Sequence, residues 1–166
     1  MMIWENVYGT YNGWQESDRI LWRKAVRILR RFSDLLTSDA WDPFYPAAQP
    51  GVFIHRWPGE GMELFTLLNH GEVLKDQLLF EVEKQQDRVL FDLWNGMELA
   101  PAEQDGKVLV RGMLERLGCV LSISKGMVTD DFRVWLADRG RIEQEIGMPS
   151  QQPTSAAREA GAEPQA

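Results

Sequence analysis

Apolar side chains recur at helical spacing near the start of the chain and predict an amphipathic helix from Ser17 to about Ser38. Ser17 suits the N-cap position, and Asp18 places a negative charge in the first turn, where the helix dipole favours it. The predicted apolar stripe consists of Leu21, Trp22, Ala25, Val26, Leu29, Phe32 and Leu36. The other side carries Arg19, Arg23, Lys24, Arg27, Arg30 and Arg31. We interpret these cations as a solvated helix face rather than as a binding patch.

Short apolar and β-branched runs, separated by turn residues, fill the middle of the chain and predict about six strands. The runs are 52–57, 62–68, 78–82, 89–93, 107–111 and 118–124. Strands at this spacing favour an antiparallel β-sandwich. A second helix, capped by Thr129 or Asp130 and continuing to about Glu145, should pack against the sandwich.

Prolines and composition divide the chain into five parts. Pro43, Pro46 and Pro50 predict an ordered linker over 43–51, because each proline removes a backbone donor and biases its predecessor toward an extended conformation. Residues 147–166 hold almost no large apolar side chains and are expected to be disordered. The expected fold class is mixed α and β, with a strand–loop–helix unit at 1–42, the linker, the sandwich at 52–126, a C-terminal helix at 127–146 and the tail.

Composition narrows the classes of function. Hydrophobic residues make up 44% of the chain and seven are Trp, which is ample for a packed core. The net charge of -7 gives no overall electrostatic reason to bind nucleic acid. A lone Cys119 cannot form an internal disulfide, and the isolated His55 and His70 do not make a zinc site, so we expect no metal and no cofactor. The start of the chain has neither a signal sequence nor a membrane anchor, which predicts a cytoplasmic protein by default if Met1 is the true start.

The most informative candidate site lies at residues 4–14, after the short strand predicted over Met1 to Trp4. The segment holds one carboxylate among aromatic and amide side chains, namely Glu5 with Trp4, Asn6, Tyr8, Tyr11, Asn12 and Trp14. Aromatic rings can stack on the C–H face of a sugar, amides can bind its hydroxyl groups, and a carboxylate can take part in glycoside cleavage. Alternatively, the two Trp fill the space between strand and helix while Glu5 pairs with an arginine.

Other motifs are structural in our interpretation. Residues 91–99 predict a hairpin with a type I′ turn at Asn95-Gly96, so that Asp92 and Glu98 support the turn or face solvent. The glycines between Arg56 and Met62 set a turn and lack the spacing of a phosphate-binding loop. His55 is interpreted as a strand histidine with satisfied hydrogen bonds, and Cys119 as a small core residue.

Three stretches together resemble a known family. Residues 4–9, Trp-Glu-Asn-Val-Tyr-Gly, and the helix after them are similar to the last strand, loop and helix of the (β/α)₈ barrel in certain bacterial glycoside-hydrolase-like proteins. Residues 51–69 and 91–99 are similar to the C-terminal β-sandwich of those proteins. The resemblance implies that Glu5 is a catalytic or sugar-contacting carboxylate with Trp4, Asn6 and Tyr8 beside it. A complete barrel takes about 250 residues, so the resemblance also implies that most of the barrel is missing from this chain.

Two functions follow as alternatives. The first is a C-terminal fragment of a glycoside-hydrolase-like protein, in which the sandwich is accessory to a barrel encoded upstream. The second is a stand-alone, non-catalytic sandwich that binds carbohydrate or a protein partner, with the N-terminal helix packed on the sandwich. An unpaired strand at Met1 to Glu5 would favour self-association or pairing with the missing barrel portion.

We predict that the isolated chain does not hydrolyse glycosides, because the reaction ordinarily needs two carboxyl groups and the sequence offers one plausible member, Glu5. The purified chain is assayed with aryl glycosides, together with Glu5→Gln. Robust turnover that disappears in Glu5→Gln would contradict the prediction.

Overall fold

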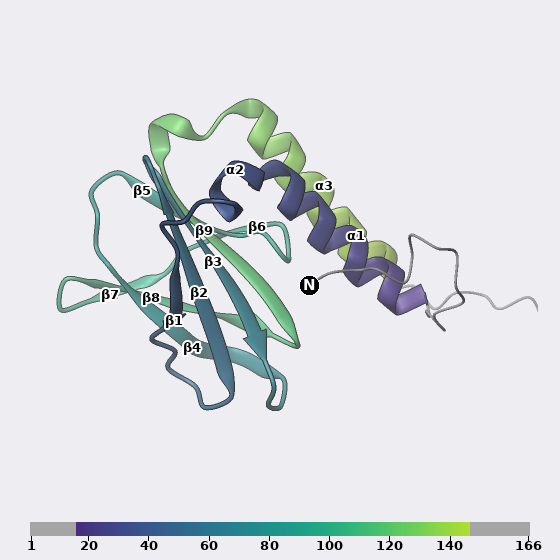
Figure 1. Ribbon diagram of the computed structural model, residues 1–166, viewed down its shortest axis with the longest axis horizontal. Helices are drawn as coiled ribbons and strands as arrows, with labels where there is room; N and C mark the ends of the chain where they lie inside the picture. Colours follow the sequence, from purple (N-terminus) through teal and green to yellow (C-terminus); the bar gives the residue numbers. More distant parts are fainter. Residues whose placement is uncertain (1–15, 147–166) are drawn as a thin grey trace, which may run out of the picture.

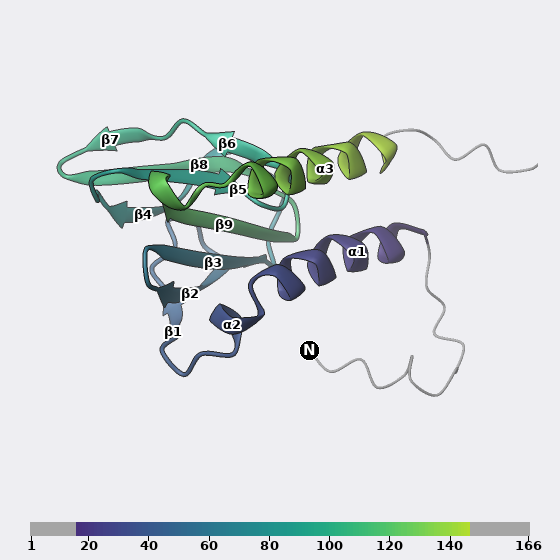
Figure 2. The same ribbon diagram turned by 90° about the horizontal axis from the view of Figure 1, so that it is seen from above.

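A six-stranded antiparallel sheet lies at the centre of the protein, between a smaller sheet and a pair of helices (Figures 1 and 2). The computed structural model describes residues 16–146, and for residues 16, 17 and 140–146 it describes the backbone alone. The large sheet has the order β1 (Asp42–Tyr45), β2 (Val52–Gly59), β3 (Met62–Asn69), β9 (Leu117–Ser124), β5 (Arg88–Asp92) and β6 (Met97–Leu99). The small sheet has the order β4 (Leu74–Glu83), β8 (Lys107–Leu114) and β7 (Ala102–Gln104).

The helices cover the face of the large sheet that points away from the small sheet. They are α1 (Glu16–Arg31), the short α2 (Ser33–Leu36), the 3₁₀ turn η1 (Lys125–Met127) and α3 (Asp130–Ile146). Figures 1 and 2 both show α1 and α3 side by side, running in opposite directions. No helix in the described part of the chain is long and apolar enough to cross a membrane.

Two apolar cores result from this layering. The first lies between the sheets and includes Ile54, Phe65, Phe80, Val110 and Val120. The second lies between the large sheet and the helices and includes Ile28, Phe32, Leu64, Phe91, Cys119, Leu121 and Phe132. In β9 the side chains from Cys119 to Ile123 are all buried, since alternate positions enter the two cores.

Most elements predicted from the sequence are present. The six predicted strands correspond to β2, β3, β4, β5, β8 and β9, and the antiparallel sandwich is confirmed. The short strand β1 falls partly within the segment predicted as a linker, and it pairs with β2. The helix predicted to continue to Ser38 is interrupted at Phe32, where α1 ends and α2 follows. The strand predicted over Met1 to Trp4 and the disordered tail over 147–166 lie outside the described residues.

The hairpin between β5 and β6 has a longer turn than the predicted two-residue type I′ turn. Asp92 pairs with Met97, so four residues separate the strands, and Gly96 alone among these four has a positive φ, of 73°. One carboxylate oxygen of Asp92 accepts hydrogen bonds from the backbone N–H groups of Trp94 and Asn95, at 2.9 and 3.0 Å. This side chain therefore supports the turn, as predicted, and Glu98 is exposed.

A buried arginine joins both long helices to this turn. Arg139 of α3 is fully buried; its Nε donates to the Leu93 carbonyl at 3.0 Å and its Nη1 donates to the Lys24 carbonyl of α1 at 2.9 Å. The Lys24 side chain is also buried, and its Nζ lies 4.7 Å from the centre of the Trp94 ring. The assignment of Lys24 to a solvated helix face is therefore wrong, because α3 and the β5–β6 turn pack over it.

The buried position of Lys24 predicts how stability depends on pH. Burial, followed by the nearby charge of Arg139, lowers the pKa of Lys24 to about 8, whereas an unfolded lysine has a pKa of about 10.4. Between these values the unfolded chain binds more protons than the folded chain, so the free energy of unfolding should rise with pH across this window. Urea unfolding at several pH values should show a smaller rise for Lys24→Met than for the native chain. An equal pH response in both proteins would contradict the lowered pKa.

Candidate functional site

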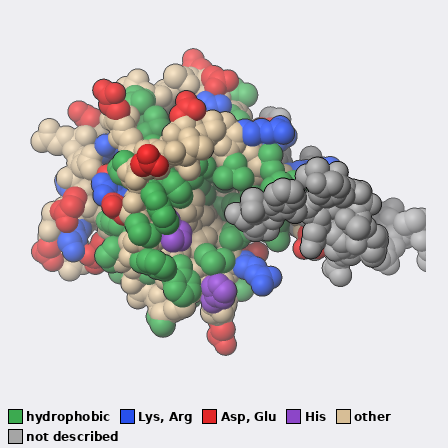
Figure 3. Space-filling model, in the orientation of Figure 1, with side chains coloured by type: hydrophobic (Ala, Val, Ile, Leu, Met, Phe, Trp, Pro, Cys, Tyr) green, Lys and Arg blue, Asp and Glu red, His purple; other side chains and the backbone are tan. Residues whose placement is uncertain are grey.

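Aromatic side chains gather on the outer side of β1 and β2, and we call Trp41, Phe44, Phe53, His55 and Trp57 the aromatic face. The alternation of side chains along β2 explains why three of these residues share one side. Val52 and Ile54 enter the core between the sheets, so Phe53, His55 and Trp57 point to the opposite side. In Figure 3 one histidine (purple) lies within a broad apolar area (green), and the other lies at its edge near charged side chains.

Four rings of the aromatic face contact one another, whereas Phe53 contacts His70, with ring centres 5.7 Å apart. Trp41 stacks on Trp57 with ring centres 5.3 Å apart and an angle of 17° between the planes. His55 lies between Trp41 and Phe44, with ring centres at 5.4 and 5.6 Å. Trp57 is anchored, because its Nε1 donates to Thr66 Oγ1 at 3.3 Å and its ring packs against the core under the helices. The stack on the anchored Trp57 therefore holds the Trp41 ring in place, while 42% of the Trp41 residue remains exposed.

Phe44 reaches the aromatic face through an irregularity in β1. Asp42 pairs with Arg56 and Tyr45 pairs with Ile54, so two residues of β1 lie opposite one residue of β2. Phe44 adopts a left-handed backbone conformation with φ of 58°, a conformation that costs a bulky residue about 1–2 kcal/mol. The ring is 72% exposed, so core burial does not compensate this strain. The same irregularity directs Tyr45 inward, where its hydroxyl donates to the Glu81 carbonyl at 2.9 Å.

Charged groups of β1 and β2 are held together in ion pairs. Arg56 donates to Asp42 at 2.7 Å and to Glu63 at 2.5 Å, and the Glu63 bond is the main cause that raises the pKa of Arg56. Because Arg56 alternates with His55 and Trp57 along β2, its Cα–Cβ bond points to the other side of the sheet. None of the five residues of the aromatic face carries a carboxylate. This surface suits an uncharged ligand with flat apolar parts.

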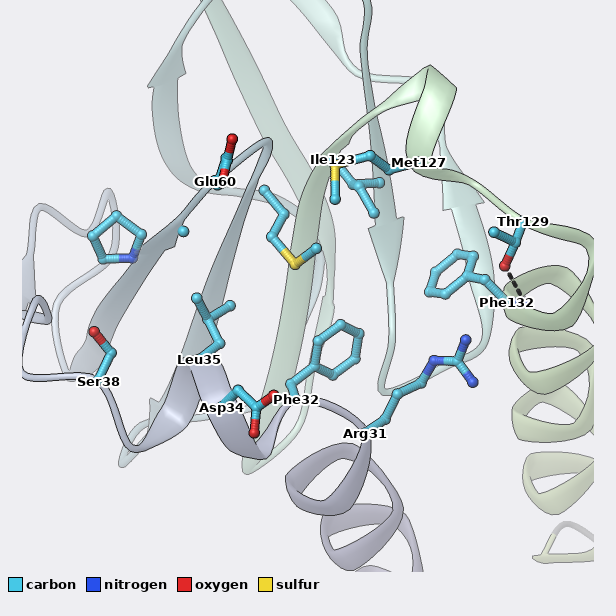
Figure 4. A pocket seen from close by; sticks show the side chains of 13 residues that line it. Arg31, Phe32, Asp34, Leu35, Ser38, Glu60, Ile123, Met127, Thr129 and Phe132 are labelled. Atoms are coloured by element: carbon cyan, nitrogen blue, oxygen red, sulfur yellow. Dashed lines mark hydrogen bonds between the residues drawn. The ribbon is translucent and has the colours of Figure 1, made fainter.

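A groove lies next to the aromatic face at the end of β2, where Pro58 and Gly59 follow Trp57. The groove has a volume of about 580 Å³ and is enclosed by the end of α1, by α2, by the β2–β3 hairpin and by the segment from η1 into α3 (Figure 4). Its apolar side chains are Phe32, Leu35, Met62, Ile123, Met127 and Phe132. The hairpin approaches α2 closely at Gly59, where a Cβ atom would lie 2.6 Å from Leu35 Cδ1.

Trp4, Glu5, Asn6, Tyr8, Tyr11 and Trp14 lie outside the described residues, and their role stays a prediction. Cys119 is a buried core residue, as predicted, and burial raises the pKa of its thiol. His55 was predicted to have all its hydrogen bonds satisfied. This prediction is wrong, because its buried Nδ1 atom has no hydrogen-bond partner. Among the side chains that the structure describes, residues 18–139, no group of three or more His, Cys, Asp and Glu could hold a metal ion.

Sequence reasoning missed the aromatic face as a unit. Phe53, His55 and Trp57 alternate along a predicted strand, which was a signal that they share one side. Trp41 and Phe44 stand in a proline-rich segment, and their position depends on the irregular pairing of β1 with β2.

Comparisons with known proteins give a weak structural similarity to a glycoside hydrolase. No family model matches the chain, and no curated protein matches it. The structure is similar to the crystal structure of an Anoxybacillus alpha-amylase, described as giving insights into a new glycosyl hydrolase subclass, with 17% sequence identity and a TM-score of 0.41. The match covers 59% of this chain and 21% of the amylase chain, so it spans about a fifth of that enzyme's length.

The strain at Phe44 can be measured by comparing Phe44→Ala with Phe44→Gly. Both variants remove the ring, but alanine keeps the cost of the left-handed conformation while glycine relieves it. We expect Phe44→Gly to unfold at a higher urea concentration and to be more stable than Phe44→Ala by about 1 kcal/mol. A Phe44→Ala protein as stable as Phe44→Gly would show that the backbone at this position is not strained.

Proposed function

We propose that the chain is an accessory β-sandwich unit of a carbohydrate-active, glycoside-hydrolase-like protein, and that its aromatic face binds carbohydrate. The observation that carries the proposal is Phe44, a bulky ring held exposed in a strained conformation against His55, which also contacts the exposed ring of Trp41. Strain of this kind concentrates at functional sites, because it persists only where the surrounding structure imposes it.

The chemistry of the aromatic face supports carbohydrate as the ligand. Sugar rings present C–H groups that pack on flat aromatic surfaces, and their hydroxyl groups remain available to water or to polar side chains. The Trp41 ring is already fixed by its stack on Trp57, so binding would order few additional torsions. Since Arg56 and its acidic partners belong to the other side of β2, a neutral glycan suits this surface better than a charged one.

The proposed role is binding rather than hydrolysis. Glycoside cleavage ordinarily uses two carboxyl groups about 5 to 10 Å apart, and the aromatic face contributes none. In this proposal Glu5 is one carboxylate of the catalytic site, in line with the sequence resemblance, and a barrel portion outside the chain supplies the other. The sandwich would then hold the polysaccharide near the barrel.

A protein surface is the second candidate ligand for the aromatic face. Exposed apolar areas on folded proteins commonly mark interfaces, and Phe53, Trp41 and Phe44 are 41%, 42% and 72% exposed. In that case the barrel portion itself would cover these rings. The two candidates differ in one respect that can be measured, because only the first allows the isolated chain to bind glycans.

Carbohydrate binding is tested by affinity electrophoresis of the purified chain in gels containing a neutral polysaccharide, either soluble starch, a mixed-linkage β-glucan or xylan. We expect retardation by at least one of them, and we expect Trp41→Ala or Phe44→Ala to weaken it by about threefold to tenfold per ring. Met113→Ala, which removes an exposed apolar side chain on β8 of the small sheet, is the matched control and should bind normally. Retardation by none of the three glycans, or an equal loss in Met113→Ala, would refute the proposal.

A further inference from the structure

We propose that the groove between α1, α2, the β2–β3 hairpin and the start of α3 is a docking site for a short, basic amphipathic helix of a partner protein. The groove and the aromatic face share no residue, so this inference does not depend on carbohydrate binding. It rests on the apolar floor of the groove, on its two methionines and on the charges along its rim.

The floor can accept several apolar side chains in a row. Figure 4 shows Phe32 and Leu35 on one side and Ile123, Met127 and Phe132 on the other, facing a common space. A volume of about 580 Å³ can hold a few anchoring side chains but not a folded domain. An amphipathic helix presents such anchors at every third or fourth residue, and grooves formed between helices commonly bind partners in this way.

Two methionines make the floor adaptable. Met62 comes from β3 and Met127 from η1, and Met127 is 41% exposed. Unbranched thioether side chains change conformation at low cost, and for this reason they are common at surfaces that bind helical peptides. A rigid aliphatic floor would instead favour one ligand shape.

The charge of the rim selects a basic partner. Asp34 on α2 and Glu60 on the hairpin stand on the rim, and neither forms an ion pair with any cation among the described residues (Figure 4). Arg31, the one cation that lines the groove, is already neutralised by Asp131 at 2.7 Å and packs against the Phe132 and Trp135 rings. Lysine or arginine flanking the apolar anchors would therefore meet unpaired carboxylates.

The experiment measures binding of a fluorescein-labelled synthetic peptide of about 14 residues, built from Leu and Lys in a helical amphipathic order, to the full chain by fluorescence anisotropy. A second peptide has Glu in place of Lys, and a third has the Leu/Lys composition in a non-amphipathic order. We expect saturable binding of the first peptide only, and weaker binding at higher salt concentration.

Matched variants separate the groove from the general negative charge of the protein. Asp34→Asn combined with Glu60→Gln should weaken binding by about tenfold, whereas Asp76→Asn combined with Glu83→Gln, two exposed carboxylates on β4, should leave it unchanged. Met127→Ser should also weaken binding, by about fivefold, while Met113→Ser on the small sheet should not. These sites are exposed, so folding should be preserved in all variants. Absence of saturable binding, equal losses in the two charge pairs, or equal binding of the Glu peptide would overturn the proposal.

Discussion

The central sheet must be covered on both faces, and this requirement determines the rest of the structure. Five successive side chains of β9, from Cys119 to Ile123, are buried, so neither face of this strand can meet water. The small sheet covers one face, and α1 and α3, joined through Arg139, cover the other. The helices lie over β3, β9 and β5, and their cover becomes incomplete toward β1 and β2. Both the aromatic face and the groove lie along this incomplete cover.

The elements that could be predicted from the sequence are those whose signal is local. Alternating or continuous apolar runs predicted the six longer strands, and helical spacing with Thr129 as a cap predicted α3. The strand β1 could not be predicted, because Pro43 and Pro46 argue against a strand and only pairing with β2 at the sheet edge stabilises it. The β5–β6 turn differs from the Asn-Gly expectation because the Asp92 carboxylate binds the backbone of Trp94 and Asn95.

The burial of the charged side chain of Lys24 could not be predicted from the sequence either. Helical periodicity placed Lys24 with the cations of α1, and nothing in the local sequence distinguishes it from Arg23 or Arg27. Its burial depends on the turn after β5 and on α3, which are about 70 and 115 residues away along the chain. The aromatic face likewise depends on tertiary structure, because the pairing of β1 with β2 brings Trp41 and Phe44 to Trp57 and His55.

Two unfavourable features of the structure meet at the aromatic face, while a second buried polar atom without a hydrogen-bond partner, Arg139 Nη2, lies in α3. Besides glycines, the described residues with positive φ are Asp76, Asp87, Asp105 and Phe44, and aspartate tolerates this conformation far better than phenylalanine. The buried His55 Nδ1 without a hydrogen-bond partner lies beside Phe44, and such an atom costs about 1–3 kcal/mol. A glycine at position 44 would remove the strain, and a polar residue there would reduce the exposed apolar area. In the proposal made above, a ligand that contacts these rings would give a function to the strain at Phe44 and to the exposed rings beside His55.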